Sequence, residues 1–158
     1  EIGSGLVGSE MCIRDSMECG VAAKRDLKKG RTSPAVERLI ECNILLSGVG
    51  FESGGLALAH AIANGLTILP ECKAMHGEAV AFGLVVQLRL ERAPELDQVL
   101  EFCQRVGLPT TLEELGLDEI SDADLMSIAD AVFRNERNMA NEQAKVTKQK
   151  LVQLMCEA

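Results

Sequence analysis

Residues 48–83 read GVGFESGGLALAHAIANGLTILPECKAMHGEAVAFG, and both histidines of the chain, His60 and His76, lie inside this run. The irregular segment 66–75 separates them and is long enough to reverse the chain between two helices. We therefore expect His60 in the middle of one helix and His76 at the start of the next. Two imidazoles carried in this way can converge on one point.

The first of these helices is predicted from its ends and its small residues. Ser53 is a favourable cap for a helix that begins at Gly54, and Gly65 is a typical stop. The positions between them carry little side-chain bulk, with alanine at 57, 59, 61 and 63. We expect a buried, crowded helix that other backbones and a ligand can approach closely.

The second helix is predicted to open near His76. Its continuation AVAFGLVV, residues 79–86, is apolar on nearly all sides. Such a pattern indicates a helix surrounded by protein.

The two histidines suggest a metal site without proving one. Neutral imidazoles suit zinc or ferrous iron, and a catalytic site commonly adds a third protein ligand and an open position. However, a histidine on a helix of small residues is more often a hydrogen-bonded core residue. His60 and His76 are also too far apart for a compact motif such as HExxH, which the chain lacks. The residues alone leave both readings open, with Cys72 as a further possible ligand.

The runs GVGFESGGLALAHAIANGLT and HGEAVAFGLVVQLRLERAP closely resemble the carboxy-terminal half of NAD-dependent glycerol dehydrogenases, a branch of the iron-containing alcohol dehydrogenase family. The resemblance extends from Ser33 to Leu125 and weakens beyond. It implies an all-α helical bundle. This bundle corresponds to the carboxy-terminal metal-binding domain of the two-domain, dehydroquinate-synthase-like fold.

The resemblance also implies the site. In the family an upstream aspartate and two histidines hold the metal, which is zinc in glycerol dehydrogenases, and iron is the alternative. The histidines match His60 and His76, and Phe51 matches a residue that lines the substrate pocket. The family pattern differs at Ala63, where relatives often carry a second histidine, and at Arg137-Asn138-Met139-Ala140, where they tend to read His-Asn-Met-Pro. Ala63 does not match a metal ligand.

By the same resemblance, the metal lowers the pKa of a glycerol hydroxyl while hydride passes to NAD⁺, which yields dihydroxyacetone. A separate amino-terminal α/β domain binds the NAD in the family. We expect that domain and the aspartate ligand to be missing here, and the chain alone to be inactive. Relatives form homo-oligomers.

Helix starts are predicted elsewhere from caps and proline. Ser33 and Pro34 open one helix, Pro94 opens another that ends at Gly107, and Ser121 and Thr147 cap two more. The apolar stripes are predicted at Leu96, Val99, Leu100, Cys103 and Val106, then at Leu125, Ile128, Ala129 and Val132, and finally at Leu151, Leu154 and Met155. A short amphipathic helix is expected over 17–29, and a capping-box turn over 111–116. No strand alternation interrupts this all-α pattern.

Composition excludes several classes of function. A net charge of −8, with no Trp or Tyr, offers neither a basic stripe nor a stacking platform for nucleic acid. No apolar stretch reaches the ~20 residues that a membrane helix needs. Six cysteines without CxxC spacing or a secretory leader indicate reduced thiols in the cytoplasm. The acidic residues between 113 and 124 lack the spacing of an EF-hand and favour a solvated rim.

Residues 1–16 are predicted to be a non-native leader. Gly3 to Gly8 spells GxGxxG, but no strand can precede it as a dinucleotide site requires. The string VGSEMCIRDS resembles translated readthrough of a sequencing-library adaptor. We therefore expect the helical metal- and substrate-binding domain to cover residues 17–158.

Three other interpretations remain. An iron-dependent dehydrogenase of the same fold would act on simple alcohols, although GFESGG favours the glycerol branch. A non-catalytic helical interaction module would retain the histidines without needing them. An incomplete gene model would have lost an upstream dinucleotide domain.

Overall fold

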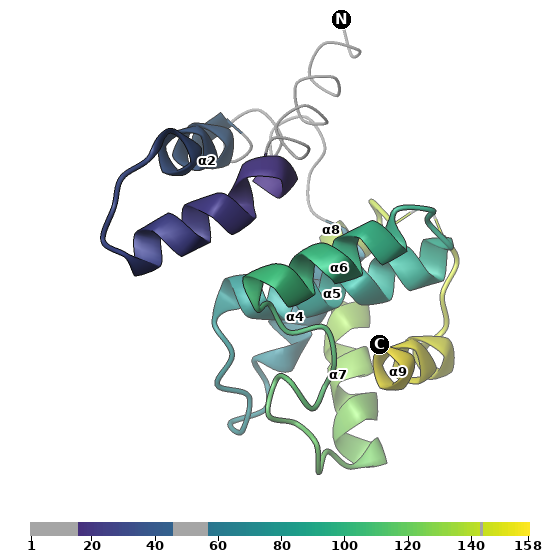
Figure 1. Cartoon of the computed structure of the whole chain (residues 1–158). Helices are drawn as coiled ribbons and strands as arrows, with labels where there is room; N and C mark the ends of the chain where they lie inside the picture. Colours follow the sequence, from purple (N-terminus) through teal and green to yellow (C-terminus); the bar gives the residue numbers. More distant parts are fainter. Residues whose placement is uncertain (1–15, 46–56, 143) are drawn as a thin grey trace, which may run out of the picture. The chain divides into compact units, whose positions relative to one another are not determined.

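The computed structural model of the chain describes residues 16–45, 57–142 and 144–158, in which all regular structure is helical (Figure 1). The predicted all-α fold is confirmed. The chain divides into two compact units, residues 1–55 and 56–158. No described helix combines the length and apolar character that crossing a membrane would require.

The first unit contains a helix over residues 16–28 and α2, Pro34–Leu45. Both helices were expected, and Pro34 occupies the first helical position, where its missing N–H leaves no bond unmade. Gly30 makes the turn between them with a φ of +65°, a conformation that favours glycine. Ala23, Val36 and Cys42 are buried in this unit.

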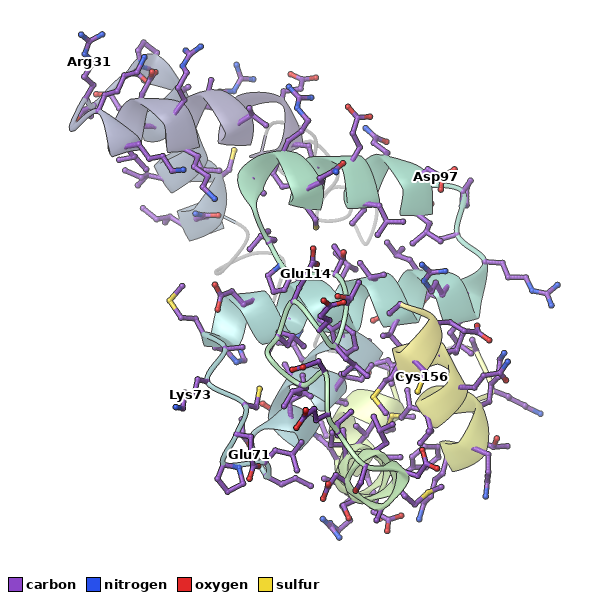
Figure 2. The ribbon with its side chains drawn as sticks, turned by 60° about the horizontal axis from the view of Figure 1, so that its bottom comes forward. Arg31, Glu71, Lys73, Asp97, Glu114 and Cys156 are labelled. Atoms are coloured by element: carbon purple, nitrogen blue, oxygen red, sulfur yellow. The ribbon has the colours of Figure 1, made fainter. Side chains whose placement is uncertain are left out.

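The second unit carries both histidines. Its helices are α4 (Leu58–Leu66), α5 (His76–Glu91), α6 (Leu96–Val106), α7 (Asp122–Arg134), α8 (Glu136–Met139) and α9 (Lys148–Glu157). Helix α4 is the centre of the unit, since it packs against α5, α7 and α8. Helices α5 and α6 run side by side, and α9 packs against α5 and α7 (Figures 1 and 2).

Two predicted helix starts are confirmed by hydrogen bonds, and one predicted helix end is confirmed by its backbone conformation. Ser121 Oγ accepts the N–H of Asp124 at 3.2 Å, and Thr147 Oγ1 accepts the N–H of Lys150 at 3.2 Å. Gly107 ends α6 with a φ of +65°. However, α6 begins at Leu96, two residues after Pro94.

The predicted core stripes are confirmed for α7 and α9 and partly for α6. All four predicted residues of α7 and all three of α9 are buried. In α6 only Cys103 and Val106 are buried, and the other apolar residues are half-buried.

The bounds predicted for the first histidine helix were wrong. Helix α4 begins at Leu58 with Ala57 as its cap residue, and it continues through Gly65 to Leu66. Ser53 lies outside the described residues. Gly65 does not end the helix but allows α7 to pack closely against it. A Cβ at this position would lie 3.0 Å from Val132 Cγ2 and 3.2 Å from Ile128 Cγ2 of α7. His60 consequently lies in the first turn of α4.

The segment after α6 forms the predicted capped turn. Thr111 Oγ1 accepts the N–H of Glu114 at 3.1 Å, and the Glu114 carboxylate accepts the N–H of Thr110 at 2.6 Å. Gly116 closes the turn with a φ of +76°. The short helix α8, with its buried Asn138, was not predicted.

Candidate metal centre

The second unit brings His60 and His76 together. His60 is the third residue of α4, and His76 is the first residue of α5. Their ring centroids are 5.9 Å apart, and the ring planes are inclined by 54°. Two imidazoles from consecutive helices therefore face a common region.

The surroundings of His60 favour its neutral form. Burial lowers the pKa of the His60 imidazole, and the nearby His76 lowers it further. His60 is half-buried, whereas His76 is exposed. A neutral imidazole keeps a ring nitrogen lone pair available, which a metal ligand must have.

The positions of the two rings follow from close contact between α4 and α5. A Cβ added to Gly83 would lie 2.3 Å from the carbonyl oxygen of Ala59, so only glycine allows the two backbones to approach this closely. The Ala59 N–H donates a hydrogen bond to Oε1 of Gln87 at 3.0 Å. Both contacts fix the position of Ala59, the residue immediately before His60.

The start of α5 is fixed by a local cap. Glu78 Oε2 accepts the N–H of Met75 at 2.8 Å, which satisfies the backbone just before His76. The carboxylate of Glu78 also suits the positive end of the helix dipole. It is therefore engaged in ordering the helix.

Two imidazoles provide part of a zinc coordination shell. No group of three or more His, Cys, Asp or Glu residues that could hold a metal occurs among residues 16–45, 57–142 and 144–158. Cys72 therefore does not complete a three-ligand group with the histidines. The pair fits two ligand positions, and a third protein ligand would have to come from elsewhere.

Other predicted features of the site have mixed outcomes. Phe51, the predicted substrate-pocket residue, lies outside the described residues. Ala63 is fully buried in the core of the second unit. Gln87 was not singled out from the sequence, because its partner Ala59 lies 28 residues away.

A separate cavity of about 530 Å³ opens beside the first turn of α5, and neither histidine lines it. Its polar lining comes from Lys73, Glu78, Gln104 and Glu114. Figure 2 shows Lys73 and Glu71 on the loop before α5 and Glu114 on the turn after α6. The backbone and hydroxyl bonds from Thr110 lower the pKa of Glu114. The carboxylates of Glu78 and Glu114 thus both cap backbone N–H groups.

Comparisons with known proteins agree with the fold and with the resemblance. The chain is 47% identical over 142 residues to glycerol dehydrogenase of Thermotoga maritima, and 44% identical over 142 residues to that of Citrobacter freundii. Each alignment covers 88% of this chain and 39% of the relative. The chain thus spans about two fifths of the length of these relatives. No protein-family model matches.

Solved structures give the same result. A probable glycerol dehydrogenase from Sinorhizobium meliloti aligns with a TM-score of 0.90 and 34% identity, over 97% of this chain and 44% of that one. The structure of glycerol dehydrogenase from Schizosaccharomyces pombe aligns with a TM-score of 0.89 and 33% identity. The chain is therefore similar to the carboxy-terminal part of glycerol dehydrogenases.

Proposed function

We propose that His60 and His76 are two of the protein ligands of a zinc ion in an enzyme that oxidises glycerol to dihydroxyacetone with NAD. The observation that carries the proposal is the 5.9 Å separation of the two rings, which come from different helices of a chain similar to glycerol dehydrogenases. The lowered pKa of His60 supports it, because a neutral ring can donate its lone pair. Iron is the alternative metal.

The histidines would hold the ion in place, and they would not act as general bases, since a ring lone pair given to a metal cannot accept a proton. A zinc ion there would act as a Lewis acid that lowers the pKa of a glycerol hydroxyl. Phe51 would border the substrate. The nicotinamide would be presented by an amino-terminal domain outside this chain, and the cytoplasm would supply NAD.

Activity would then require more than this chain. We expect the purified 158-residue chain to show no NAD-linked glycerol oxidation, because it aligns with 39% of its relative's length, and the resemblance assigns the aspartate ligand and the dinucleotide domain to the remainder. A steady-state assay of NADH production tests this directly. Measurable turnover by the chain alone would refute it. The longer protein is expected to form a homo-oligomer.

The ligand assignment is tested in a full-length enzyme that contains this chain. His60→Ala and His76→Ala should each remove zinc, as measured by elemental analysis of dialysed protein, and abolish glycerol oxidation. Gln98→Ala, a change on the exposed surface of α6, is the control and should retain both. A full-length His60→Ala or His76→Ala enzyme that keeps one zinc per subunit would refute the assignment. A panel of polyols and simple alcohols would distinguish the glycerol branch from an alcohol dehydrogenase.

A further inference from the structure

Helix α4 begins without a cap from its own sequence. Ala57 occupies the cap position and makes no side-chain hydrogen bond to the first turn. The backbone N–H groups of that first turn have no partner within the helix. The N–H of the buried Ala59 instead donates to Oε1 of Gln87, which belongs to α5. The cap of α4 thus comes from the helix that carries the other histidine.

The side of α5 that meets α4 is continuous with His76. His76, Gly83 and Gln87 follow one another at i, i+7 and i+11, which places them on one face of the helix. Gly83 meets the carbonyl group of Ala59, and Gln87 meets its N–H. Directly before His60, Ala59 therefore has its N–H bonded to α5 and its carbonyl group packed closely against Gly83 of α5.

The orientation of the Gln87 amide is itself determined. Its Nε2 donates to Oε1 of Glu91 at 2.8 Å, one turn further along α5. A flipped amide would direct its NH₂ group at the N–H of Ala59 and its oxygen at a carboxylate, so both bonds would be lost. Glu91 thereby keeps the acceptor of Gln87 directed at α4.

We propose that Gln87 is a positioning residue for the histidine pair. By capping α4 from α5, it fixes the first turn that carries His60 relative to the first residue of α5, His76. The pair is thus assembled before a metal binds. This proposal rests on the proposed function of the two histidines. It adds a residue that acts on the backbone beside His60 and thereby determines whether the rings can share one ion.

The test follows the two imidazoles separately in the untagged 158-residue chain. Because the chain has two histidines, ¹⁵N-histidine labelling reports only His60 and His76. Zinc is titrated, and the ring nitrogen shifts are read from long-range ¹H–¹⁵N correlation spectra. In the unmodified chain both rings should shift together at one zinc concentration. Rings that respond at separate concentrations there would refute the proposed metal pair, whatever Gln87 does.

In Gln87→Ala the apparent zinc dissociation constant should rise by about tenfold, and the two rings should no longer respond together. The double variant Gln87→Glu with Glu91→Gln keeps an acceptor for the Ala59 N–H and a donor–acceptor pair between positions 87 and 91, so it should restore the shared response. Gln98→Ala should leave the response unchanged. Circular dichroism checks that each variant is folded at the titration temperature. If folded Gln87→Ala binds zinc like the unmodified chain, or if the double variant fails to restore sharing, Gln87 is only a structural cap and the proposal is overturned.

Discussion

The backbone of Ala59 lies so close to Gly83 that a Cβ added to the glycine would be 2.3 Å from the Ala59 carbonyl oxygen. No real Cβ contact is that short, and the obstructing atom belongs to a helix backbone. Any side chain at position 83 must therefore move α4 away from α5. Because His60 follows Ala59, the same movement would alter its distance from His76.

We expect Gly83→Ala to destabilise the second unit by about 1–3 kcal/mol, as overpacking does, and to weaken zinc binding by the histidine pair. Urea unfolding and zinc titration measure the two effects. Gly77→Ala is the matched control in the same helix, since nothing lies within 4 Å of a Cβ built there. It should be as stable as the unmodified chain or slightly more stable. A Gly83→Ala variant as stable as Gly77→Ala would contradict the close contact.

The ion pair between Asp130 of α7 and Lys148 of α9 should make stability depend on pH. Lys148 Nζ lies 2.5 Å from Asp130 Oδ1 and 5.9 Å from the centre of the Phe133 ring. The hydrogen bond and charge of Lys148 lower the pKa of Asp130 below its ordinary 3.8. The ion pair therefore contributes fully to the stability of the fold above pH 3.8. This stabilisation is lost as the pH falls through the lower pKa that Asp130 has in the folded chain.

Asp130→Asn should consequently be less stable than the unmodified chain at pH 7, with a difference that shrinks below pH 3.8 and at high salt. Urea midpoints at pH 7 and at acid pH measure this difference. Asp118→Asn alters an exposed carboxylate and serves as the control. An equal loss of stability at both pH values would show that the ion pair is not its cause.

The cap at Ser121 should contribute measurably to α7. Its Oγ accepts the N–H of Asp124, whereas Ser127 Oγ donates to the carbonyl of Ala123 within the helix. Ser121→Ala should cost about 0.5–2 kcal/mol, the usual range for losing a cap. Ser127→Ala should be neutral or slightly stabilising, because alanine is the better helix former. Chemical unfolding of both variants compares the two serines, and equal values would contradict the capping role.

The cysteines should differ strongly in reactivity. Cys103 is 3% exposed, and burial together with the nearby Glu114 carboxylate raises the pKa of its thiol. Cys156 is exposed near the end of α9. Iodoacetamide at pH 7.5 should therefore modify Cys156 rapidly and Cys103 only after unfolding, as peptide mass spectrometry would show. Rapid labelling of Cys103 in the folded chain would mean that α6 separates readily from α5.

The sequence predicted the helices whose starts are determined locally. Pro34, Ser121 and Thr147 act on backbone groups within a few residues, so their effect is visible in a short window of sequence. The buried stripe of α7 was predictable for the same reason, because helical periodicity alone places its members on one face. The family resemblance supplied what periodicity cannot, namely the expectation that His60 and His76 lie close together, and their ring centroids are 5.9 Å apart.

The start of α4 was mispredicted because its determinants are distant in sequence. Ser53 looked like a cap, but α4 begins at Leu58 and is capped by Gln87. Gly65 looked like a stop, yet its missing Cβ makes room for α7. Both features depend on tertiary contacts, which a local pattern of caps and glycines cannot reveal. The role of Gln87 therefore becomes visible only in the folded unit.

Both histidines stand in the opening turns of their helices, where the aligned backbone dipoles give each helix a partial positive charge. The field at such a helix start attracts negative charge. In the proposed enzyme, an oxygen atom that loses its proton beside the two rings would thus be favoured over the neutral alcohol from which it came. The backbone at the starts of α4 and α5 would then contribute to the same proposed step as the two histidines.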